Sequence, residues 1–259
     1  MNTAERQKPR PGELVLDHVA HFVADLDGAA SVFEKVALKV TPLSVHKVGG
    51  RPLGTSNRCV MFDEGYVELL SGAAGSGLRL ACFGTPEAAA ERRRLADHGF
   101  KPGAVVDLSR KIPSGKLARF KVVRPGPETM PEGRIQYCQH LTPQLLWRAP
   151  LINRMKLREL FVVADDPPAV AARWGRFAGL LPRPAADGIR LETARGAVVI
   201  ARSFPWETPP APALAGYGLA CRHPEAFAAR CSGAGIALRQ IGSRYAATLP
   251  AALGGAWVF

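Results

Sequence analysis

One order of segments returns four times along this chain of 259 residues: a strand, a short helix, and then two or three more strands. The elements predicted for the first unit are a strand at 14–23, a helix capped by Asp25 or Asp27, and strands at 42–48, 57–63 and 66–71. Each unit would leave one sheet face uncovered and must bury it against another unit. The repeat therefore predicts a duplicated α+β fold.

The three later units follow the same pattern with clear helix-start signals. Their helices are predicted to begin at Thr85-Pro86-Glu87, Asp165-Asp166-Pro167-Pro168 and His223-Pro224-Glu225, because proline is favoured in the first helical turn. Their predicted strands are 78–84, 104–109, 117–124 and 134–141, then 157–164, 183–186, 189–194 and 197–202, and finally 216–221, 236–241, 244–249 and 255–259.

The units are expected to pair into two domains. The proline-bearing segment around residue 150 is typical of a connector between domains. We therefore predict a flexible N-terminal segment at 1–13, a first domain at 14–148, a linker at 149–155 and a second domain at 156–259.

Composition restricts the partners. The formal net charge is +12, but no nucleic-acid-binding motif is present, so we expect a basic surface that attracts small anions and no nucleic-acid partner. Five single cysteines favour reduced thiols, and no apolar run is long enough for a membrane span. These features predict a cytoplasmic protein with a small-molecule substrate and no membrane partner. A homodimer is left open.

Three segments carry a resemblance to a known family. They are the strand and helix entry Leu16-Asp17-His18-Val19-Ala20-His21-Phe22-Val23 with Asp25-Leu26-Asp27, then Gly54–Arg58 with Gly65–Leu70, and finally Gln139–Trp147. In this order they resemble the vicinal-oxygen-chelate superfamily, which includes glyoxalases, methylmalonyl-CoA epimerases and extradiol dioxygenases. Within it they are similar to the glyoxalase-like subgroup.

The resemblance implies an architecture and a metal site. It implies tandem βαβββ modules paired into two glyoxalase-like domains with U-shaped mixed sheets. It also implies a divalent metal ion (Zn, Fe, Mn or Ni) in the cleft, held by the first and last strands of each module. The second domain has no histidine in its opening strand and is interpreted as a degenerate copy.

His18 matches the family's first ligand position. Strand alternation is expected to put Leu16, His18, Ala20 and Phe22 on the cleft face, and Asp17, Val19, His21 and Val23 on the other face. Imidazole suits the metals named above. His21 is accordingly interpreted as a buried structural histidine.

Glu68 and His140 complete the predicted ligand set. Glu68 lies in an apolar strand, where a carboxylate needs a partner, and it matches the family's carboxylate position as metal ligand or catalytic base. His140 ends the last strand of the second unit, where the family more often has a carboxylate. Together with His18 they would form a set of two histidines and one carboxylate. The second unit's opening strand offers only Cys82, which is more often a core residue.

Three further residues are predicted to bind the substrate: Asn57, Arg58 and Tyr66. Arg58 could pair with a substrate carboxylate, and its alternative is a salt bridge to Glu68. The functions left open are a metal-dependent lyase or isomerase acting on a small oxygenated substrate, a non-haem iron dioxygenase, and a metal-free protein that sequesters a small molecule.

Overall fold

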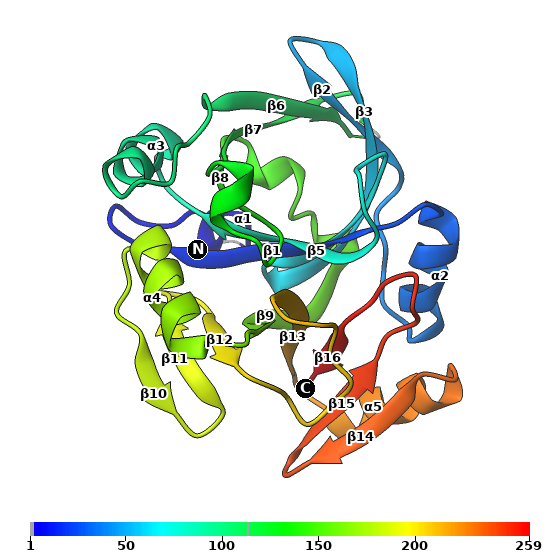
Figure 1. The fold of residues 1–259 in the computed structure, drawn as a ribbon. Helices are drawn as coiled ribbons and strands as arrows, with labels where there is room; N and C mark the ends of the chain where they lie inside the picture. The colour runs from blue at the N-terminus through cyan, green and yellow to red at the C-terminus, as the bar shows by residue number, and fades with distance from the viewer. Residues whose placement is uncertain (1–2, 113) are drawn as a thin grey trace.

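The computed structural model describes residues 3–112 and 114–259, and its elements follow the four predicted units (Figure 1). Those of the first domain are α1 (Thr3–Arg6), β1 (Val15–Phe22), α2 (Leu26–Lys35), β2 (Ser44–Val48), β3 (Arg51–Glu64), β4 (Tyr66–Ser71), β5 (Gly77–Gly84), α3 (Ala88–Asp97), β6 (Val106–Lys111), β7 (Leu117–Val123) and β8 (Arg134–His140). The predicted α+β class with tandem βαβββ modules is confirmed.

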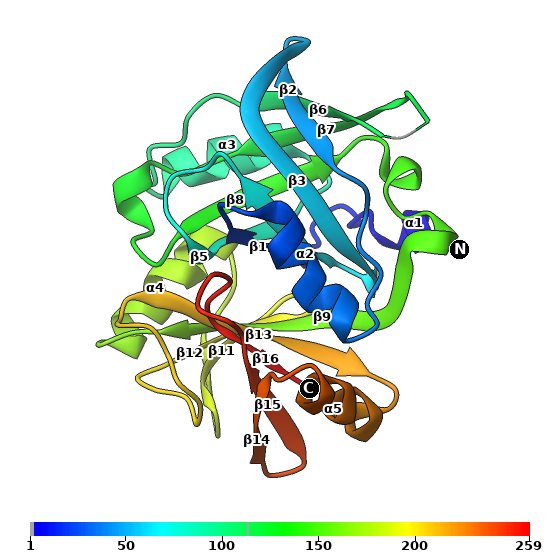
Figure 2. The same cartoon turned by 90° about the vertical axis from the view of Figure 1, so that its right-hand side faces the viewer.

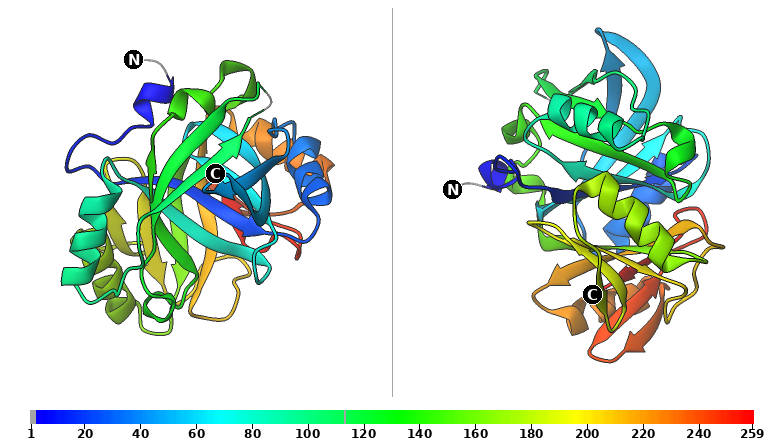
Figure 3. Two further views of the ribbon diagram at one scale, coloured as in Figure 1. Left: turned by 90° about the horizontal axis from the view of Figure 1, so that it is seen from above. Right: turned by 60° about the vertical axis from the view of Figure 1, so that its left-hand side comes forward.

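Strand pairing in the first domain curves the sheet until its ends meet. β1 lies between β4 and β5, β4 continues into β3 and β2, and β5 continues through β8 and β7 to β6. β2 and β6 then pair through His46–Val48 and Leu108–Arg110, which joins the two modules on the side opposite β1 and β5. Figure 1 shows this ring of strands in the upper part of the molecule, and Figure 3 shows the same strands from above and from the side. The sheet therefore encloses an interior in which side chains from eight strands face one another.

The second domain has an open sheet. Its elements are β9 (Ile152–Val163), α4 (Pro167–Ala178), β10 (Arg183–Ala185), β11 (Gly188–Glu192), β12 (Ala197–Ala201), β13 (Ala213–Cys221), α5 (Pro224–Gly233), β14 (Ala237–Ile241), β15 (Arg244–Thr248) and β16 (Ala256–Val258). β9 and β13 pair at its centre, with β12 beside β9 and β16 beside β13. Short one-turn helices lie at Pro127–Thr129, Pro143–Leu145 and Ala149–Leu151.

The two domains share a core rather than touching through a linker. β9 pairs in parallel with β3, at Met61 with Ile152 and at Phe62 with Asn153, so the segment 149–155 that was expected as a linker already contains the start of β9. One continuous cluster of buried apolar side chains includes members from both domains. Figure 2 shows the second sheet directly below the first domain, next to α2.

The N-terminal segment and the start of α3 differ from what the sequence predicted. The segment 1–13 was expected to be flexible, yet Ala4 packs into the first domain's interior and Gln7 donates to the Asp63 carbonyl. Helix α3 begins two residues later than the threonine signal indicated, because Thr85 Oγ1 accepts from the Glu87 backbone N–H and Glu87 occupies the cap. Asp25 caps α2 as predicted.

The alternation predicted for β1 is wrong at its start. The register with β5 shifts between Leu16 and His18, so the strand contains a β-bulge there. Leu16 therefore packs with the outer core, whereas Asp17 joins His18 on the interior side. Gly84 faces this bulge, and a Cβ at Gly84 would lie 2.7 Å from a Val15 methyl group.

No helix within residues 3–112 and 114–259 is long and apolar enough to cross a bilayer.

His21 lies at the contact between the domains. Its Nδ1 lies 2.7 Å from the Leu253 carbonyl oxygen and its Nε2 lies 3.1 Å from the Tyr217 hydroxyl. Burial lowers the pKa of His21 from 6.5 to about 4, against the effect of the Leu253 carbonyl. The interpretation of His21 as a buried, hydrogen-bonded histidine agrees with these contacts.

We expect His21 to make folding sensitive to acid. Below pH 6.5 the unfolded chain binds a proton at His21 that the folded chain rejects, so stability is full above that pH and falls as the pH drops toward 4. Between pH 7 and pH 5 this amounts to about 2 kcal/mol. Urea unfolding at both pH values should show a flatter pH dependence for His21→Gln than for the wild type. The exposed His98→Gln is the control, and an equal slope in His21→Gln would contradict the assignment.

Candidate functional site

The interior of the first domain contains a cavity of about 290 Å³. Polar groups from six strands and from Arg124, just after β7, reach it, together with apolar side chains that also come from β5 and β7. The polar lining residues are His18, His46, Thr55, Asn57, Tyr66, Glu68, Arg110, Arg124, Arg134, Gln136 and Cys138. A chamber lined by apolar side chains and convergent polar groups is typical of a small-molecule site.

His18 is held in one orientation by its neighbour Asp17. His18 Nδ1 lies 2.7 Å from Asp17 Oδ2, and the His18 ring stacks on Tyr66 with centroids 4.4 Å apart. Burial would raise the pKa of Asp17, but the charges and hydrogen bonds of His140 and His18 hold it well below its usual range. An ionised carboxylate can only accept, so His18 donates from Nδ1 and its neutral form keeps the lone pair on Nε2.

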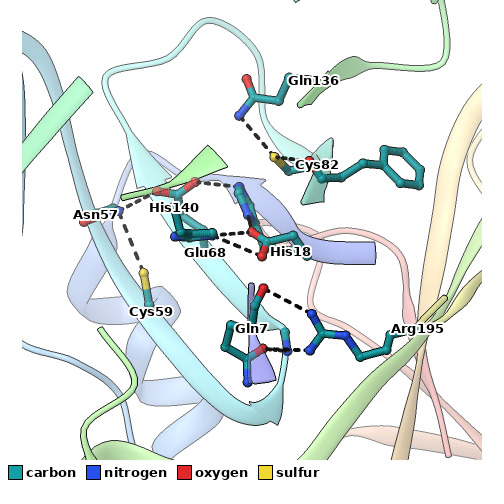
Figure 4. A network of polar contacts seen from close by, with 12 residues as sticks. Gln7, His18, Asn57, Cys59, Glu68, Cys82, Gln136, His140 and Arg195 are labelled. Atoms are coloured by element: carbon teal, nitrogen blue, oxygen red, sulfur yellow. Dashed lines mark hydrogen bonds and ion pairs between the residues drawn. The ribbon is translucent and has the colours of Figure 1, made fainter. Parts of the chain in front are cut away.

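His140 also binds Asp17. Its Nε2 donates to both carboxylate oxygens, at 2.9 and 3.1 Å, and its side chain is 2% exposed. Burial would lower the pKa of His140, but Asp17 and Cys138 outweigh that effect and raise it to about 10. His140 is absent from the described residues that line the cavity. Figure 4 shows His18 and His140 close together beside Glu68.

Glu68 faces the free nitrogen of His18. Its Oε2 lies 4.0 Å from His18 Nε2, and its Oε1 accepts from Asn57 Nδ2 and lies 3.5 Å from His46 Nε2. Burial would raise the pKa of Glu68, but His46, His18, the Asn57 hydrogen bond and Arg110 together lower it. Glu68 is therefore a buried carboxylate, ionised at neutral pH, beside an imidazole lone pair.

The pairing register reveals an approximate two-fold relation within the first domain. In the β1–β5 pairing, His18 lies opposite Cys82. Two residues further along each of these strands, Ala20 of β1 lies opposite Glu68 of β4, and Gly84 of β5 lies opposite Cys138 of β8. Cys82 and Cys138 are thus the counterparts of His18 and Glu68 in the second module. A hydrogen bond from Cys82, together with His140 and against the effect of burial, lowers the pKa of Cys138 to about 6.

Two of the three predicted substrate-binding residues reach the cavity. Asn57 and Tyr66 line the cavity. Asn57 donates to Glu68 and approaches His46 Nε2 at 3.1 Å, while its Oδ1 has no hydrogen-bond partner. Arg58 is not among the lining residues. Its Nη2 instead donates to Asp27 on α2 at 2.6 Å, so neither the cavity nor Glu68 receives its charge.

Eight polar residues near the site were not among the sequence candidates: Asp17, His46, Thr55, Arg110, Arg124, Arg134, Gln136 and Cys138. His46 was within reach of sequence reasoning, because it lies inside a predicted strand that is otherwise partly apolar. Asp17 was not, since a bulge put it on the interior side. The arginines come from strands whose inward faces become clear only once the sheet closes.

The matching face of the second domain has a cavity of about 580 Å³, but no histidine or glutamate is among the described residues that line it. Glu159 in β9 is neutralised by Arg190 at 3.1 Å and by Arg244 at 2.5 Å. A cluster of buried apolar side chains also lies on that face: Phe161, Val163, Val199, Trp206, Ala215, Ala246, Ala256 and Val258. No described residue after Cys138 lines the cavity of the first domain, so the second domain acts on the site through packing alone.

The donor set fits a divalent metal ion. A metal bound by nitrogen or carboxylate oxygen needs bonds of about 2.1 Å each, so atoms 4.0 Å apart such as His18 Nε2 and Glu68 Oε2 can reach one ion. Asp17 on His18 Nδ1 is the carboxylate partner that metal-binding histidines usually have. Asp17, His18 and Cys82 also offer ligand atoms that lie within 4.8 Å of one another.

The fold and the site place the chain in a class of duplicated βαβββ proteins with a polar chamber inside the first domain. The family model described as the glyoxalase-like domain matches residues 16–178, which is more than half of the chain. The chain therefore belongs to the glyoxalase-like domain family, and the resemblance found in the sequence is confirmed. None of the curated proteins compared with it matches.

Solved structures share this fold across nearly the whole chain at 13% identity. A hypothetical protein from Staphylococcus aureus has a TM-score of 0.71 and covers 95% of this chain and 98% of its own. A mutant 4-hydroxymandelate synthase from Streptomyces coelicolor has a TM-score of 0.62, covering 95% and 92%. A Mn(II)-bound glyoxalase from Novosphingobium aromaticivorans has a TM-score of 0.56, covering 94% and 81%. At this identity the likeness shows the fold alone.

Proposed function

We propose that the protein is a metal-dependent lyase or isomerase that acts on a small oxygenated anion inside the first domain. The observation that carries the proposal is the pair of His18 Nε2 and Glu68 Oε2, buried, 4.0 Å apart and open to the cavity. The Mn(II)-bound glyoxalase of the same fold supports a divalent ion at such a place. When bound, the ion would draw electron density from substrate oxygens and stabilise an enolate-like anion.

The chain's own residues would prepare this site in defined ways. Asp17 fixes the His18 tautomer, and His140 balances the charge of Asp17. Asn57 holds the Glu68 carboxylate and leaves its Oδ1 free to accept from a substrate hydroxyl or a water molecule. Glu68, ionised at neutral pH, would serve as ligand or as the base that moves a proton. His18, Asn57 and Glu68 are buried, and their withdrawal from water strengthens these electrostatic effects.

This reading favours a lyase or isomerase over a non-haem iron dioxygenase. The dioxygenase site needs two histidines and one carboxylate on one ion. His140, proposed from the sequence as the second histidine, commits its Nε2 to Asp17, and the nitrogens of His46, the other cavity histidine, contact Thr55 and Asn57. We therefore propose His18 and Glu68 as the metal ligands, with Cys82 beside them and His140 as a positioning residue.

Metal content tests the proposal. After chelation and reloading with Mn²⁺, Zn²⁺, Ni²⁺ or Fe²⁺, the wild type should bind about one ion per chain, measured by inductively coupled plasma mass spectrometry. His18→Ala and Glu68→Ala should each lower the affinity by at least about tenfold, because each removes one of few ligands.

His98→Ala, an exposed histidine on the same domain, is the matched control and should bind as the wild type does. Circular dichroism would verify that each variant is folded. Unchanged metal binding in both His18→Ala and Glu68→Ala would remove the proposed site. Iron with substrate-linked oxygen uptake would instead support the dioxygenase, and a wild type without affinity for any of the four ions would support a metal-free binding protein.

A further inference from the structure

A second chamber adjoins the inner cavity. This outer chamber of about 620 Å³ is built by the segment before β6 and by the loop between β7 and β8. It shares Val122, Arg124 and Arg134 with the inner cavity, so these three residues line the boundary between the two, which we take as a passage. A ligand that extends from one chamber into the other would pass these two arginines.

The two arginines at this passage lack ion-pair partners. Neither forms an ion pair with a carboxylate in the described part of the chain. Arg124 Nε donates to the neutral Gln136 Oε1 at 2.8 Å, and the Arg134 guanidinium lies 4.9 Å from the centre of the Phe22 ring. The Glu68 carboxylate attracts both guanidinium groups, but it lies beyond hydrogen-bond distance from each of them. Arg190 and Arg244, by contrast, both form ion pairs with Glu159.

Such an arrangement is unfavourable without a ligand. Burial and then the charge of Arg134 lower the pKa of Arg124, so the two guanidinium groups repel one another while both are partly withdrawn from water. Arg110, fully buried in the inner cavity, adds a third positive charge, and its Nε has no hydrogen-bond partner. An anion placed between Arg124 and Arg134 would remove the repulsion and form charge-assisted hydrogen bonds.

The outer chamber is suited to an apolar group. Its walls are the side chains of Val106, Val122, Pro125 and Pro127 together with backbone at Gly103, Gly126 and Gly133. Lys101 is its one cationic side chain other than the two arginines of the passage, within the described lining. A hydrocarbon or similar tail would bury apolar surface there at little polar cost.

We propose that the substrate is an anion with an apolar tail: its carboxylate or phosphate group lies between Arg124 and Arg134, its tail occupies the outer chamber, and its reacting oxygens reach toward His18 and Glu68. The orientation of the reacting end rests on the proposed function. The anion clamp and the tail chamber rest on the arginines and on the shape of the two cavities, so they can be tested without any metal.

Binding of simple probes tests the clamp. Isothermal titration calorimetry on the metal-free protein would compare octanoate with 1-octanol, which has the tail without the charge, and with acetate, which has the charge without the tail. We expect octanoate to bind at least tenfold more tightly than either. Comparing the affinities of octyl phosphate and octanoate shows which anionic group the two arginines prefer.

Arg124→Gln and Arg134→Gln should each weaken octanoate binding by at least tenfold, while leaving 1-octanol binding unchanged. Arg119→Gln, an exposed arginine on β7, is the matched control and should bind octanoate as the wild type does. Equal affinity for octanoate and 1-octanol, or unchanged octanoate binding in both passage variants, would overturn the proposal. Loss of metal binding in His18→Ala without loss of octanoate binding would separate this proposal from the metal site.

Discussion

Asp17→Asn is expected to destabilise the fold by about 3 kcal/mol and to weaken metal binding by about 10- to 100-fold. The carboxylate of Asp17 accepts from His140 Nε2 and His18 Nδ1 in a setting almost free of water. His140, whose pKa is raised to about 10, carries its charge at neutral pH and would lose its counterion. His18 would lose the acceptor that fixes its tautomer. Urea unfolding and metal titration would measure the two effects.

A double-mutant cycle separates the two roles of Asp17. Adding His140→Phe to Asp17→Asn removes the unpaired histidine and should recover part of the stability, but it should not restore metal affinity. Asp27→Asn is the control, because Asp27 is an exposed aspartate whose ion pair with Arg58 lies at the surface. It should change stability by less than about 1 kcal/mol. If Asp17→Asn unfolds at the wild-type urea concentration, the buried network does not stabilise the protein as argued.

The order and nature of the elements could be predicted from the sequence because local signals agree with one another throughout the chain. Strands such as β4 (Tyr66–Ser71) and β7 (Leu117–Val123) fall where apolar and β-branched residues cluster between turns. Proline at the start of α4 and α5 and the left-handed Gly179 after α4 define helix limits from single residues. Signals of this kind depend on a few neighbouring residues, so a single sequence contains them.

The site was predicted only in part because it depends on register. His18 and Glu68 could be chosen as candidates, and the structure brings them to 4.0 Å. The same reasoning could not show that one extra residue in β1 would put Asp17 beside them. It also could not show that Arg58 would face α2 while Arg124 and Arg134 face the interior. A one-residue shift moves side chains between faces, and no local pattern records it.

The second domain is a structural partner of the first. Phe33 on α2 packs on Trp257 of β16 with ring centroids 5.1 Å apart, and His21 on β1 contacts Tyr217 of β13. Trp257 also donates from its indole nitrogen to the Tyr217 hydroxyl, and it stacks on Phe227. The back of the strand that carries His18 is therefore supported by the second domain. Stability of that contact is a condition for the geometry of the site.

Trp257→Ala is expected to cost about 4 kcal/mol and to lower the melting temperature of the whole chain by roughly 10 °C. The indole is fully buried, so its removal leaves a cavity at the contact between the domains and leaves the Tyr217 hydroxyl without a donor. Because one apolar core spans both domains, differential scanning calorimetry should show a single transition in the wild type and in the variant. Leu181→Ala, at a leucine that is 79% exposed, should shift the transition by little and serves as the control. Two separated transitions in Trp257→Ala, with the first domain melting at the wild-type temperature, would show that the domains fold independently and that the strand carrying His18 needs no support from the second sheet.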